Sequence, residues 1–505
     1  MANGHQFAHQ SLLPNALGVA ADPGPFPWQQ RLYERFLRSE LPRSIDVPTG
    51  LGKTSVMALW LLARADNPGL PRRLVYVVDR RAVVDQATSE AERLRDWVSS
   101  TPEIARALGL ASETRLAVST LRGQFVDNRE WLEDPARPAI VVGTVDMIGS
   151  RLLFQGYGVS RRMRPYHAGL LAYDSLFVVD EAHLVPAFER LLDEVTRELT
   201  GTLGPVRSLG EQLPPTSRLV TLSATGRTHQ GESFVLDAND SEHPIARRRI
   251  QAPKRVLLHD LPADAKLSDA VVAKARELLD REGPPRRLVL YLDRRRDAIA
   301  VAGELRKLAV AGQTGKNKQP TFDVELLVGA RRVWERQRAQ EWLAEHGFLP
   351  SGEASLERSA VLVATSAGEV GVDLDAEHAV CDLVAWERMV QRFGRVNRRG
   401  LGAAEIHVLA QPPAAKKGKA KASADEEEIP AETGEGSPED GAKGGASGPE
   451  EDSDLRRFRV RREALSSLPR LPEGGFDGSV AALRSLANRA EREPELAELL
   501  LRATT

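Results

Sequence analysis

Short runs of β-branched and other apolar residues recur along the chain, separated by longer stretches with helical periodicity. The first series is RSIDVP, RLVYVVD, RLAVS, AIVVGT, SLFVVD and SRLVTLS, all before residue 224. The second series is RVLLHD, RLVLYLD, FDVELLV, AVLVATS, HAVCDLVA and AEIHVLA. This alternation is typical of parallel sheets with helices on both faces. The pattern therefore predicts an α/β fold of two tandem parallel-sheet domains that meet near residues 245–255.

Bulk composition limits the class of protein and its partners. The 505 residues are 42% hydrophobic and 28% charged, with a formal net charge of −2 at pH 7. A balance so close to zero provides no chain-wide basic field, so any nucleic-acid site must be a local groove. The single cysteine, Cys381, lies in an apolar run that suggests a buried strand, and it cannot form an internal disulfide. We expect a reduced, cytoplasmic protein with no signal sequence and no membrane span.

Changes in composition divide the chain into five segments. We expect an N-terminal extension over 1–24, a first domain over 25–250 and a second over 251–410. Residues 411–454 contain a basic block and then acidic blocks with almost no large apolar residue, which predicts a disordered linker. Residues 455–505 show the apolar spacing of short amphipathic helices, too few for a core of their own. We expect these helices to pack on another domain, or on a region that this sequence does not contain.

The strongest chemical signal is VPTGLGKT, residues 47–54, between a predicted strand and a predicted helix. Small residues let backbone N–H groups converge on phosphate oxygens, and the following helix presents its positive end to the same anion. Lys53 would neutralise the β- and γ-phosphates of ATP, while the Thr54 hydroxyl would bind Mg²⁺. Val47 replaces the usual first glycine, and a chance glycine turn is the alternative. The predicted loop contacts are Thr49, Gly50, Leu51, Gly52, Lys53 and Thr54.

A second signal is LFVVDEAHL, an apolar strand that ends in Asp180 and Glu181. Carboxylates at the end of a neighbouring parallel strand can share a metal ion with a phosphate loop. We predict that Asp180 holds Mg²⁺ and that Glu181 polarises the attacking water. His183 of the same stretch is assigned to the nucleotide site. The alternative is a solvated acidic helix start.

The stretch PFPWQQ, residues 25–30, places a glutamine beside aromatic side chains just before the first strand. An amide can pair with the adenine edge while an aromatic ring packs on the base. We predict that Gln29 makes the amide contact and that Phe26 or Trp28 supplies the ring. The alternative is a core tryptophan flanked by surface glutamines.

Three further motifs follow the phosphate loop and the acidic stretch in order. TLSAT contains Ser223, Ala224 and Thr225, and VATSAGEVGVDLD contains Thr365, Glu369, Gly371 and Asp373, while VQRFGRVNRRG ends the series. In this order the set resembles that of superfamily-2 helicases. The resemblance implies two RecA-like domains, a coupling role for SAT, and a place in the nucleotide site for Gly371 and Asp373.

The arginines of VQRFGRVNRRG need an anion or carboxylates nearby, because no acidic residue lies among them. If the segment is helical, Gln391, Arg395 and Arg398 fall at i, i+4 and i+7 on one stripe that faces the cleft. We predict that these three stabilise the transferring phosphoryl group. Arg392 and Arg399 lie on an adjacent stripe, where they could pair with carboxylates or with a strand phosphate.

A translocase grips the backbone of a strand rather than its bases, since it must pass any sequence. We expect the groups that do so to lie on loops along one surface of both domains. For each arginine among them, a solvated surface charge is the alternative, although we favour DNA contact for the charged segment SRRMRPYH. The candidates are Arg80, Arg81, Thr120, Arg122, Thr144, Arg161, Arg162, Arg164, Arg294 to Arg296 and Thr365.

The sequence is also similar to one branch of this superfamily. The stretches YGVSRRMRPYHAGLL, GEVGVDLDAEHAVCDLVAWERMVQ and GRVNRRG resemble the type I CRISPR-associated DEAH-box helicase of subtype I-G, formerly I-U. The resemblance runs from about Pro25 to Leu409. It implies an ATP- and Mg²⁺-dependent motor that works as a monomer, is recruited by the Cascade complex and pulls the displaced single-stranded DNA in the 3′ to 5′ direction.

Relatives often join this motor to an HD nuclease. Here the only HD dipeptide is His259–Asp260, inside a predicted strand, and we interpret it as chance. We therefore expect no nuclease activity from this chain, with an HD nuclease acting in trans or on a further C-terminal region. Two alternatives to the DNA helicase remain open, an RNA helicase of the same superfamily and a nucleotide-gated scaffold for a separate nuclease.

Overall fold

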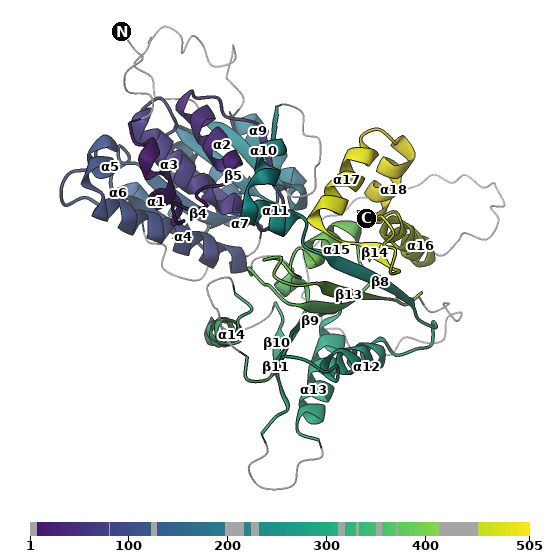
Figure 1. Ribbon diagram of the computed structural model, residues 1–505. Coiled ribbons are helices and arrows are strands. Elements are labelled where there is room, and N and C mark those ends of the chain that lie inside the picture. Colours follow the sequence, from purple (N-terminus) through teal and green to yellow (C-terminus); the bar gives the residue numbers. More distant parts are fainter. Residues whose placement is uncertain are drawn as a thin grey trace, which may run out of the picture.

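The computed structural model describes residues 8–79, 81–122, 129–196, 217–223, 232–311, 319–329, 333–349, 356–369, 372–413 and 453–504. Within these ranges the chain forms two seven-stranded sheets. Figure 1 shows the first with its helices in purple to teal, the second in green, and the last three helices in yellow on the second sheet. The predicted fold class, two tandem RecA-like α/β domains, is confirmed.

The first sheet has the strand order β3-β4-β2-β5-β6-β1-β7, and all its neighbouring strands are parallel. Every residue of β2 and β4 is buried, because helices cover both faces of the sheet. Six strands match the apolar runs of the sequence, and the short edge strand β7 is an addition. The strands are β1 (Ser44–Asp46), β2 (Arg73–Val78), β3 (Ala117–Leu121), β4 (Ala139–Thr144), β5 (Ser175–Asp180), β6 (Arg218–Ser223) and β7 (Ser233–Val235).

Helices connect these strands and pack on the sheet. The longest, α4 (Arg81–Ser100), follows β2, while α10 (Ala238–Glu242) and α11 (Pro244–Ile250) lead toward the second sheet. Part of the expected N-terminal extension belongs to this core, since Leu13 and Ala16 of α1 (Leu13–Leu17) are buried in it. The other helices are α2 (Pro27–Leu37), α3 (Val56–Asp66), α5 (Pro102–Ala107), α6 (Glu130–Glu133), α7 (Val145–Leu152), α8 (Arg164–Ala172) and α9 (Pro186–Thr196).

The second sheet has the order β10-β11-β9-β12-β13-β8-β14. Its first six strands in this order are parallel and correspond to the second series of apolar runs. Cys381 is buried in β12, as its apolar neighbours predict. The strands are β8 (Lys254–Asp260), β9 (Arg287–Tyr291), β10 (Phe322–Leu327), β11 (Ser359–Ala364), β12 (His378–Asp382) and β13 (Ala404–Ala410). The helices are α12 (Leu267–Leu279), α13 (Arg295–Ala309), α14 (Val333–Glu345) and α15 (Trp386–Phe393).

The C-terminal segment completes the second domain. Its strand β14 (Phe476–Asp477) pairs antiparallel with β8, a pairing too short to be seen in the sequence. Leu465, Leu486 and Leu496 are buried in the core that also holds Phe393. The segment therefore packs on another domain, as its sparse apolar spacing predicts. Its helices are α16 (Ser453–Ser466), α17 (Val480–Ala490) and α18 (Pro494–Thr504).

Two further expectations concern the disordered linker and the absence of a membrane span. Residues 414–452 of the predicted linker lie outside the described residues. In the ranges that the structure does describe, no helix has the length and apolarity needed to cross a membrane.

The strand order determines where motifs can meet. In the first sheet β6 lies between β1 and β5, so Ser223 at the end of β6 stands between the phosphate loop and the acidic stretch. Parallel strands bring their carboxyl ends to one edge, where α/β proteins bind ligands. The nucleotide motifs of the first domain are therefore neighbours in space.

Candidate functional site

The phosphate loop connects β1 to the short 3₁₀ turn Lys53–Ser55 that precedes α3. Gly50 (φ 89°) and Gly52 (φ 79°) lie in the left-handed region, which glycine enters without the penalty of a side chain. Trp28 supports the loop from within the domain, since its Nε1 donates to the Leu51 carbonyl at 3.2 Å and its side chain is buried. The prediction that Trp28 packs on a base is therefore wrong, because this indole belongs to the core.

Gln29 is also buried, and both ends of its amide are bonded within the protein. Its Oε1 accepts from the Phe26 backbone N–H at 2.9 Å, and its Nε2 donates to Ser55 Oγ at 2.9 Å. Phe26 and Gln29 nevertheless line the cavity described below, and the Phe26 ring meets His243 edge-on at 4.9 Å. Adenine pairing by Gln29 stays a prediction, and it requires exchange of these two hydrogen bonds.

The acidic pair at the end of β5 faces the loop. Lys53 Nζ lies 2.6 Å from Glu181 Oε1, while Tyr76 donates its hydroxyl to Asp180 Oδ2 at 3.0 Å. Burial raises the pKa of Asp180. Burial would also raise the pKa of Glu181, but the charges of Lys53 and its neighbours outweigh it and lower that pKa. The pKa values of the two adjacent carboxyls are thus shifted in opposite directions, which is typical of neighbouring carboxyls that have different chemical roles.

Asp180 also fits a metal ion. In the described part of the chain its Oδ1 is buried without a hydrogen-bond partner. Such an atom is costly unless an ion or donor reaches it. Mg²⁺ commonly takes one or two carboxylate ligands together with substrate phosphates, so Asp180 and the nearby Thr54 hydroxyl form a suitable set.

Glu181 has a strained backbone. Its φ of 49° and ψ of 49° are left-handed, which costs a non-glycine residue about 1–2 kcal/mol. The strain occurs where β5 gives way to the 3₁₀ turn Ala182–Leu184. Such outliers cluster at functional sites, where the surrounding fold holds them. The turn aims the carboxylate at Lys53.

His183 lies behind Glu181 rather than in the cavity wall. It is buried, with Nδ1 3.5 Å from Glu181 Oε2 and Nε2 4.0 Å from Glu387 Oε2 on α15. The cavity lining does not include it among the described residues. His183 therefore links the acidic stretch to the second domain, and direct nucleotide contact stays a prediction.

A cavity of about 790 Å³ lies between the two domains. Sites for small ligands and cofactors are commonly of this size. The first domain supplies the phosphate loop, Asp180 and Glu181, and the second supplies a mixed set of carboxylates and arginines. The lining residues from the second domain are Asp373, Asp375, Arg395, Arg398 and Arg399.

The segment that carries these arginines is not one continuous helix, so the predicted stripe is wrong. The helix α15 ends at Phe393, and Asn397 has φ 42°. The Asn397 N–H bonds to the Ala376 carbonyl at 2.7 Å instead of continuing the helix, and its Nδ2 donates to the Pro253 carbonyl at 3.1 Å. Asparagine tolerates this left-handed conformation better than most residues. Asn397 thus fixes a turn between the domain connector and β12.

The turn still brings two predicted arginines to the cavity. Arg395 Nε donates to the Glu369 carbonyl at 3.1 Å, and its Nη1 lies 3.4 Å from Asp373 Oδ1. Arg398 pairs with the same carboxylate, and burial lowers its pKa to about 10. Its Nε is so close to the phosphate loop that a Cβ at Gly50 would lie 3.2 Å away. Both arginines therefore face the first domain.

Gln391 does not join them. Its side chain is buried in α15, and it is not among the described residues that line the cavity. Helical spacing does not apply here, because the helix ends at Phe393 and the chain turns. Arg395 and Arg398 therefore do not lie on the same helix face as Gln391. A catalytic role for Gln391 stays a prediction without a contact to support it.

The remaining arginines pair with carboxylates, which was one of the two alternatives. Arg392 is buried and reaches Glu369 and Asp382, each at 2.8 Å. Arg399 lies 3.0 Å from Asp375. Burial would raise the pKa of Glu369, but Arg392 and a second arginine lower it. Glu369 therefore binds α15 through the side chain of Arg392 and the turn after α15 through Arg395.

Arg249 contacts the site although no motif contains it. This residue of α11 lines the cavity, and its Nη1 donates to the Gly50 carbonyl at 2.5 Å. The signal in the sequence is the run of three arginines in PIARRRI, between the two series of strands. Asp375 forms an ion pair with Arg399, and its carboxylate accepts a hydrogen bond from the Arg398 backbone N–H at 2.7 Å. The sequence did not predict this residue, because the motif as identified stops at Asp373.

Most nucleic-acid candidates lie at strands away from β1 and β8. In the first domain Thr120 and Thr144 lie in β3 and β4, and Arg122 follows β3, whereas Arg80 and Arg81 follow β2, the neighbour of β5. In the second domain Arg294 to Arg296 follow β9, and Thr365 follows β11. Some already have local partners. Thr144 is buried and caps α7 by accepting from the Met147 N–H at 3.4 Å, Thr120 lies 3.0 Å from Thr88, and Arg122 pairs with Asp85.

The other candidates are placed as follows. Arg161, Arg162 and Arg294 to Arg296 are exposed, Arg164 is partly buried at the start of α8, and Thr365 is buried. Arg80, Ala224, Thr225 and Gly371 lie outside the described residues, as does the side chain of Arg81. Their roles stay predictions.

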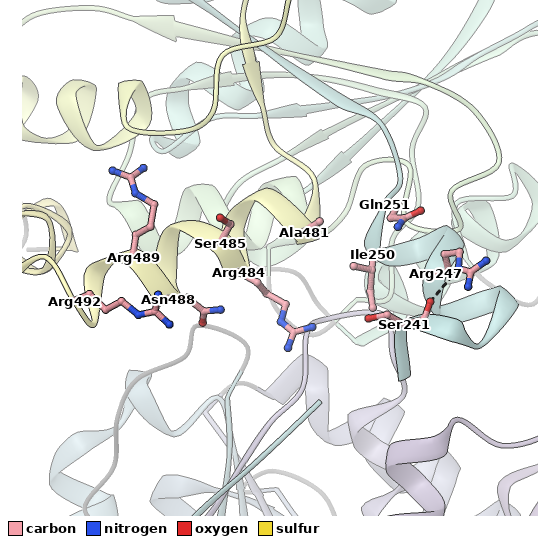
Figure 2. A pocket seen from close by; sticks show the side chains of 10 residues that line it. All are labelled: Ser241, Arg247, Ile250, Gln251, Ala481, Arg484, Ser485, Asn488, Arg489 and Arg492. Carbon is pink, nitrogen blue, oxygen red and sulfur yellow. Dashed lines mark hydrogen bonds between the residues drawn. The ribbon is translucent and has the colours of Figure 1, made fainter. Parts of the chain in front are cut away.

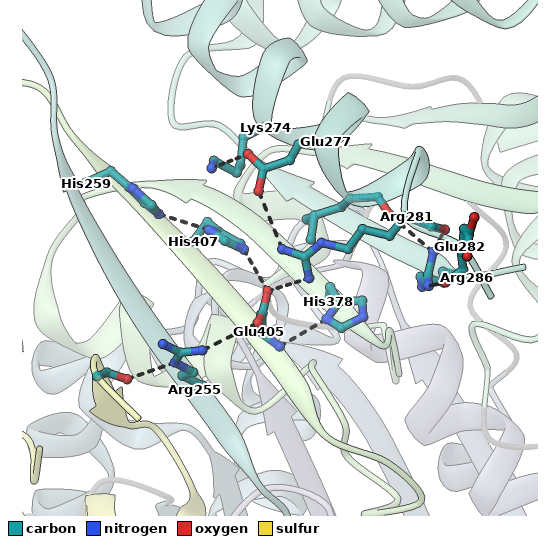
Figure 3. A network of polar contacts seen from close by, with 12 residues as sticks. Arg255, His259, Lys274, Glu277, Arg281, Glu282, Arg286, His378, Glu405 and His407 are labelled. Carbon is teal, nitrogen blue, oxygen red and sulfur yellow. Dashed lines mark hydrogen bonds and ion pairs between the residues drawn. The ribbon is translucent and has the colours of Figure 1, made fainter. Parts of the chain in front are cut away.

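The HD dipeptide has a local explanation, shown in Figure 3. His259 on β8 lies against His407 on β13, with Nε2 and Nδ1 2.9 Å apart and the rings stacked at 5.1 Å. Asp260 bonds to Arg462 of α16 at 2.7 Å. Successive residues of a strand point to opposite faces, so this pair cannot share one metal ion.

Two models of known families match parts of the chain. The family model of the DEAD/DEAH box helicase matches residues 26–232. The model for the C-terminal part of the CRISPR-associated nuclease/helicase Cas3 matches residues 293–401. Through these two matches the chain is similar to superfamily-2 helicases of the Cas3 type. A search of curated proteins finds no match for this chain.

Several solved structures share the fold of this chain. T. fusca Cas3–ADP has a TM-score of 0.55 and 20% identity, covering 97% of this chain and 55% of that one. Mycobacterium smegmatis helicase Lhr, bound to ssDNA and AMP-PNP, has a TM-score of 0.51 and 16% identity, covering 80% and 48%. The helicase MrfA bound to DNA and AMPPNP has a TM-score of 0.52 and 17% identity, covering 79% and 50%. The chain thus spans about half the length of these proteins.

Proposed function

We propose that this chain is an ATP-dependent single-stranded-DNA translocase and helicase that is recruited by Cascade to unwind target DNA in type I CRISPR interference, with 3′ to 5′ polarity. The observation that carries the proposal is the cavity between the domains, where Lys53 and Glu181 of one domain face Arg395 and Arg398 of the other. A site built from two domains makes hydrolysis depend on their closure, which couples turnover to movement. The I-G subtype stays a prediction.

The nucleotide is held mainly by the first domain. Backbone N–H groups of the phosphate loop and the Lys53 ammonium bind the phosphates, and Lys53 exchanges Glu181 for them. Release from Lys53 leaves the Glu181 carboxylate available to orient water and accept its proton. Arg395 and Arg398 approach from the second domain and stabilise the charge that develops on the transferring phosphoryl group. Asp180 and Thr54 would hold Mg²⁺, which when bound would supply neutralisation of the phosphate charge.

The single-stranded DNA passes over the part of each sheet that does not carry the nucleotide motifs. Arg122 and the segment around Arg161 follow β3 and β4 at the end of the first sheet away from β1, while Arg294 follows β9 of the second sheet. In the first domain, nucleotide and nucleic acid therefore approach different parts of the same sheet edge. When the two domains close on the nucleotide, the distance between the DNA contacts of the first domain and those of the second changes. Two structurally similar helicases were solved with DNA, which supports a DNA track here.

Loss of the phosphate-loop lysine should abolish this activity. We expect Lys53→Ala to weaken ATP binding roughly 10- to 100-fold, the usual effect of losing a hydrogen bond to a charged group, and to stop unwinding. Binding of a fluorescent ATP analogue and strand separation measure the two effects. Lys307→Ala is the matched control, because Lys307 is an exposed lysine of α13 that pairs only locally with Glu304. Normal unwinding by Lys53→Ala would refute the assignment of the loop.

The substrate class is tested by measuring ATPase rates with single-stranded DNA, single-stranded RNA or neither. We expect stimulation by DNA, loss of turnover when EDTA removes divalent metal, and affinity that is indifferent to sequence but falls steeply with salt. Stimulation by RNA alone would establish the RNA-helicase alternative. Binding of ATP without any turnover would establish the scaffold. Cleavage of DNA by the chain would contradict the expected absence of nuclease activity.

Polarity and recruitment need their own measurements. We expect partial duplexes with a 3′ single-stranded extension to be unwound and those with a 5′ extension to be left intact. Addition of purified Cascade on its target should increase unwinding of that target over an unrelated duplex. Equal unwinding of both duplexes would remove Cascade recruitment from the proposal while leaving the motor.

A further inference from the structure

The connector between the domains brings an arginine into the nucleotide cavity. Arg249 lies near the end of α11, between the first sheet and β8. Its Nη1 donates to the Gly50 carbonyl at 2.5 Å, and it shares the cavity wall with Arg395 and Arg398. The phosphate loop is thus touched by guanidinium groups from two separate segments.

Arg249 differs from the other cations of this cavity in its partner. In the ranges that the structure describes, it forms no ion pair, and its Nε is buried without a hydrogen-bond partner. An uncharged carbonyl compensates a buried cation only in part. The pairings of the others are Lys53 with Glu181, Arg395 and Arg398 with Asp373, Arg399 with Asp375, and Arg93 with Glu90. An anion that enters the cavity can therefore reach Arg249 without breaking an ion pair of that residue, and the more distant carboxylates that act on it are Asp373 and Asp375.

We propose that Arg249 binds the phosphates of ATP from the connector side of the cavity and so couples nucleotide occupancy to the position of α11. The inference rests on the proposed ATP-binding function. The hydrogen bond to Gly50 shows that the guanidinium reaches the phosphate loop. A polyphosphate there replaces a neutral acceptor by an anionic one, to which a guanidinium can donate two parallel hydrogen bonds.

The helix α11 contacts each part of the molecule that such a movement would have to reach. Ala246 and Ile250 are buried in the core of the first domain. The carbonyl of Arg248 packs directly on Gly400, which ends the turn that carries Arg395, Arg398 and Arg399, and a Cβ on that glycine would clash with the carbonyl. Figure 2 shows α11 and α17 on two sides of a cavity of about 500 Å³, which is lined by Ile250 of α11 and Arg484 of α17 among others. A displacement of α11 therefore affects both domains and the last helices.

The test measures binding of a fluorescent non-hydrolysable ATP analogue to the full chain and to its variants. We expect Arg249→Ala to bind roughly 10- to 100-fold more weakly than the unmodified chain, and Arg249→Lys to recover part of the loss. Arg248→Ala is the matched control, because it removes the same charge from an exposed neighbour on the same helix. We expect it to bind within about twofold of the unmodified chain, a difference well below that of one hydrogen bond to a charged group.

The outcomes separate this inference from the proposed function. If the unmodified chain fails to bind the analogue, the proposed function fails first. If it binds and Arg249→Ala binds equally well, the inference is overturned. In steady-state hydrolysis we expect KM for ATP to rise, whereas a fall in kcat at unchanged KM would mean that Arg249 only supports the loop. If Arg249→Ala does not fold, Arg249→Gln replaces it, since a buried neutral amide keeps a donor for the Gly50 carbonyl.

Discussion

Arg395→Ala is expected to lower the rate of ATP hydrolysis by about 10³-fold or more while ATP binding changes little. Removal of an arginine that stabilises the transferring phosphoryl group has effects of this size. Arg395 lines the cavity opposite the phosphate loop, and its charge contributes to lowering the pKa of Glu181. Turnover and analogue binding, measured on the same preparation, test the prediction.

The control for Arg395 is Arg276→Ala, which removes an exposed arginine of α12 in the same domain. We expect that variant to hydrolyse ATP at the normal rate. Arg395→Lys should recover little of the loss, because an ammonium cannot reproduce the planar fork of a guanidinium. Turnover within a few fold of normal in Arg395→Ala would exclude Arg395 from the reaction and leave Arg398 as the candidate.

Much of the fold could be predicted from the sequence. The β-branched runs of both series became strands, because a buried parallel sheet needs continuous apolar segments. The phosphate loop and the acidic stretch met as expected, because each lies at the carboxyl end of a strand and strand order made them neighbours. In these cases a local pattern was enough, since the chemistry and the strand end occur in one segment.

The failures share one physical cause, which is contact between segments distant in the sequence. Helical spacing placed Gln391 with Arg395, but Asn397 bonds to Ala376 and the helix ends. Trp28 was, beside Phe26, one of two candidates to pack on a base, yet its indole bonds to the Leu51 carbonyl. The strand β14 is two residues long, so only its partner β8 makes it a strand. No periodicity within one segment contains this information.

The same reasoning explains why Arg249 escaped notice and why Arg398 did not. Arg398 lies in a motif, and its place over Gly50 agrees with the role given to it. Arg249 lies in a connector, where a run of arginines is ordinarily a solvated surface. Only the fold shows that Arg249 points into the cavity whereas Arg248 is exposed. Connectors between domains therefore need to be examined in the structure for groups that serve the site.

Glu181→Gln is expected to reduce ATP turnover by roughly 10²- to 10⁴-fold, the usual contribution of a general base. The substitution keeps the size of the side chain but removes the charge that pairs with Lys53 at 2.6 Å. Lys53 then has no carboxylate to leave before it binds phosphate, so affinity for the ATP analogue should stay the same or increase. A merely structural role would predict the reverse, with binding and turnover falling together.

The matched control for Glu181 is Glu113→Gln, which changes an exposed glutamate in a loop of the same domain. It should leave both binding and turnover unchanged. Because the backbone of Glu181 is held in a left-handed conformation, a glycine at this position would relieve strain as well as remove the base. Glu181→Gly should therefore be as inactive as Glu181→Gln but no less stable to heat. Hydrolysis at a normal rate by Glu181→Gln would show that the attacking water is activated elsewhere, and the strained turn would then need another explanation.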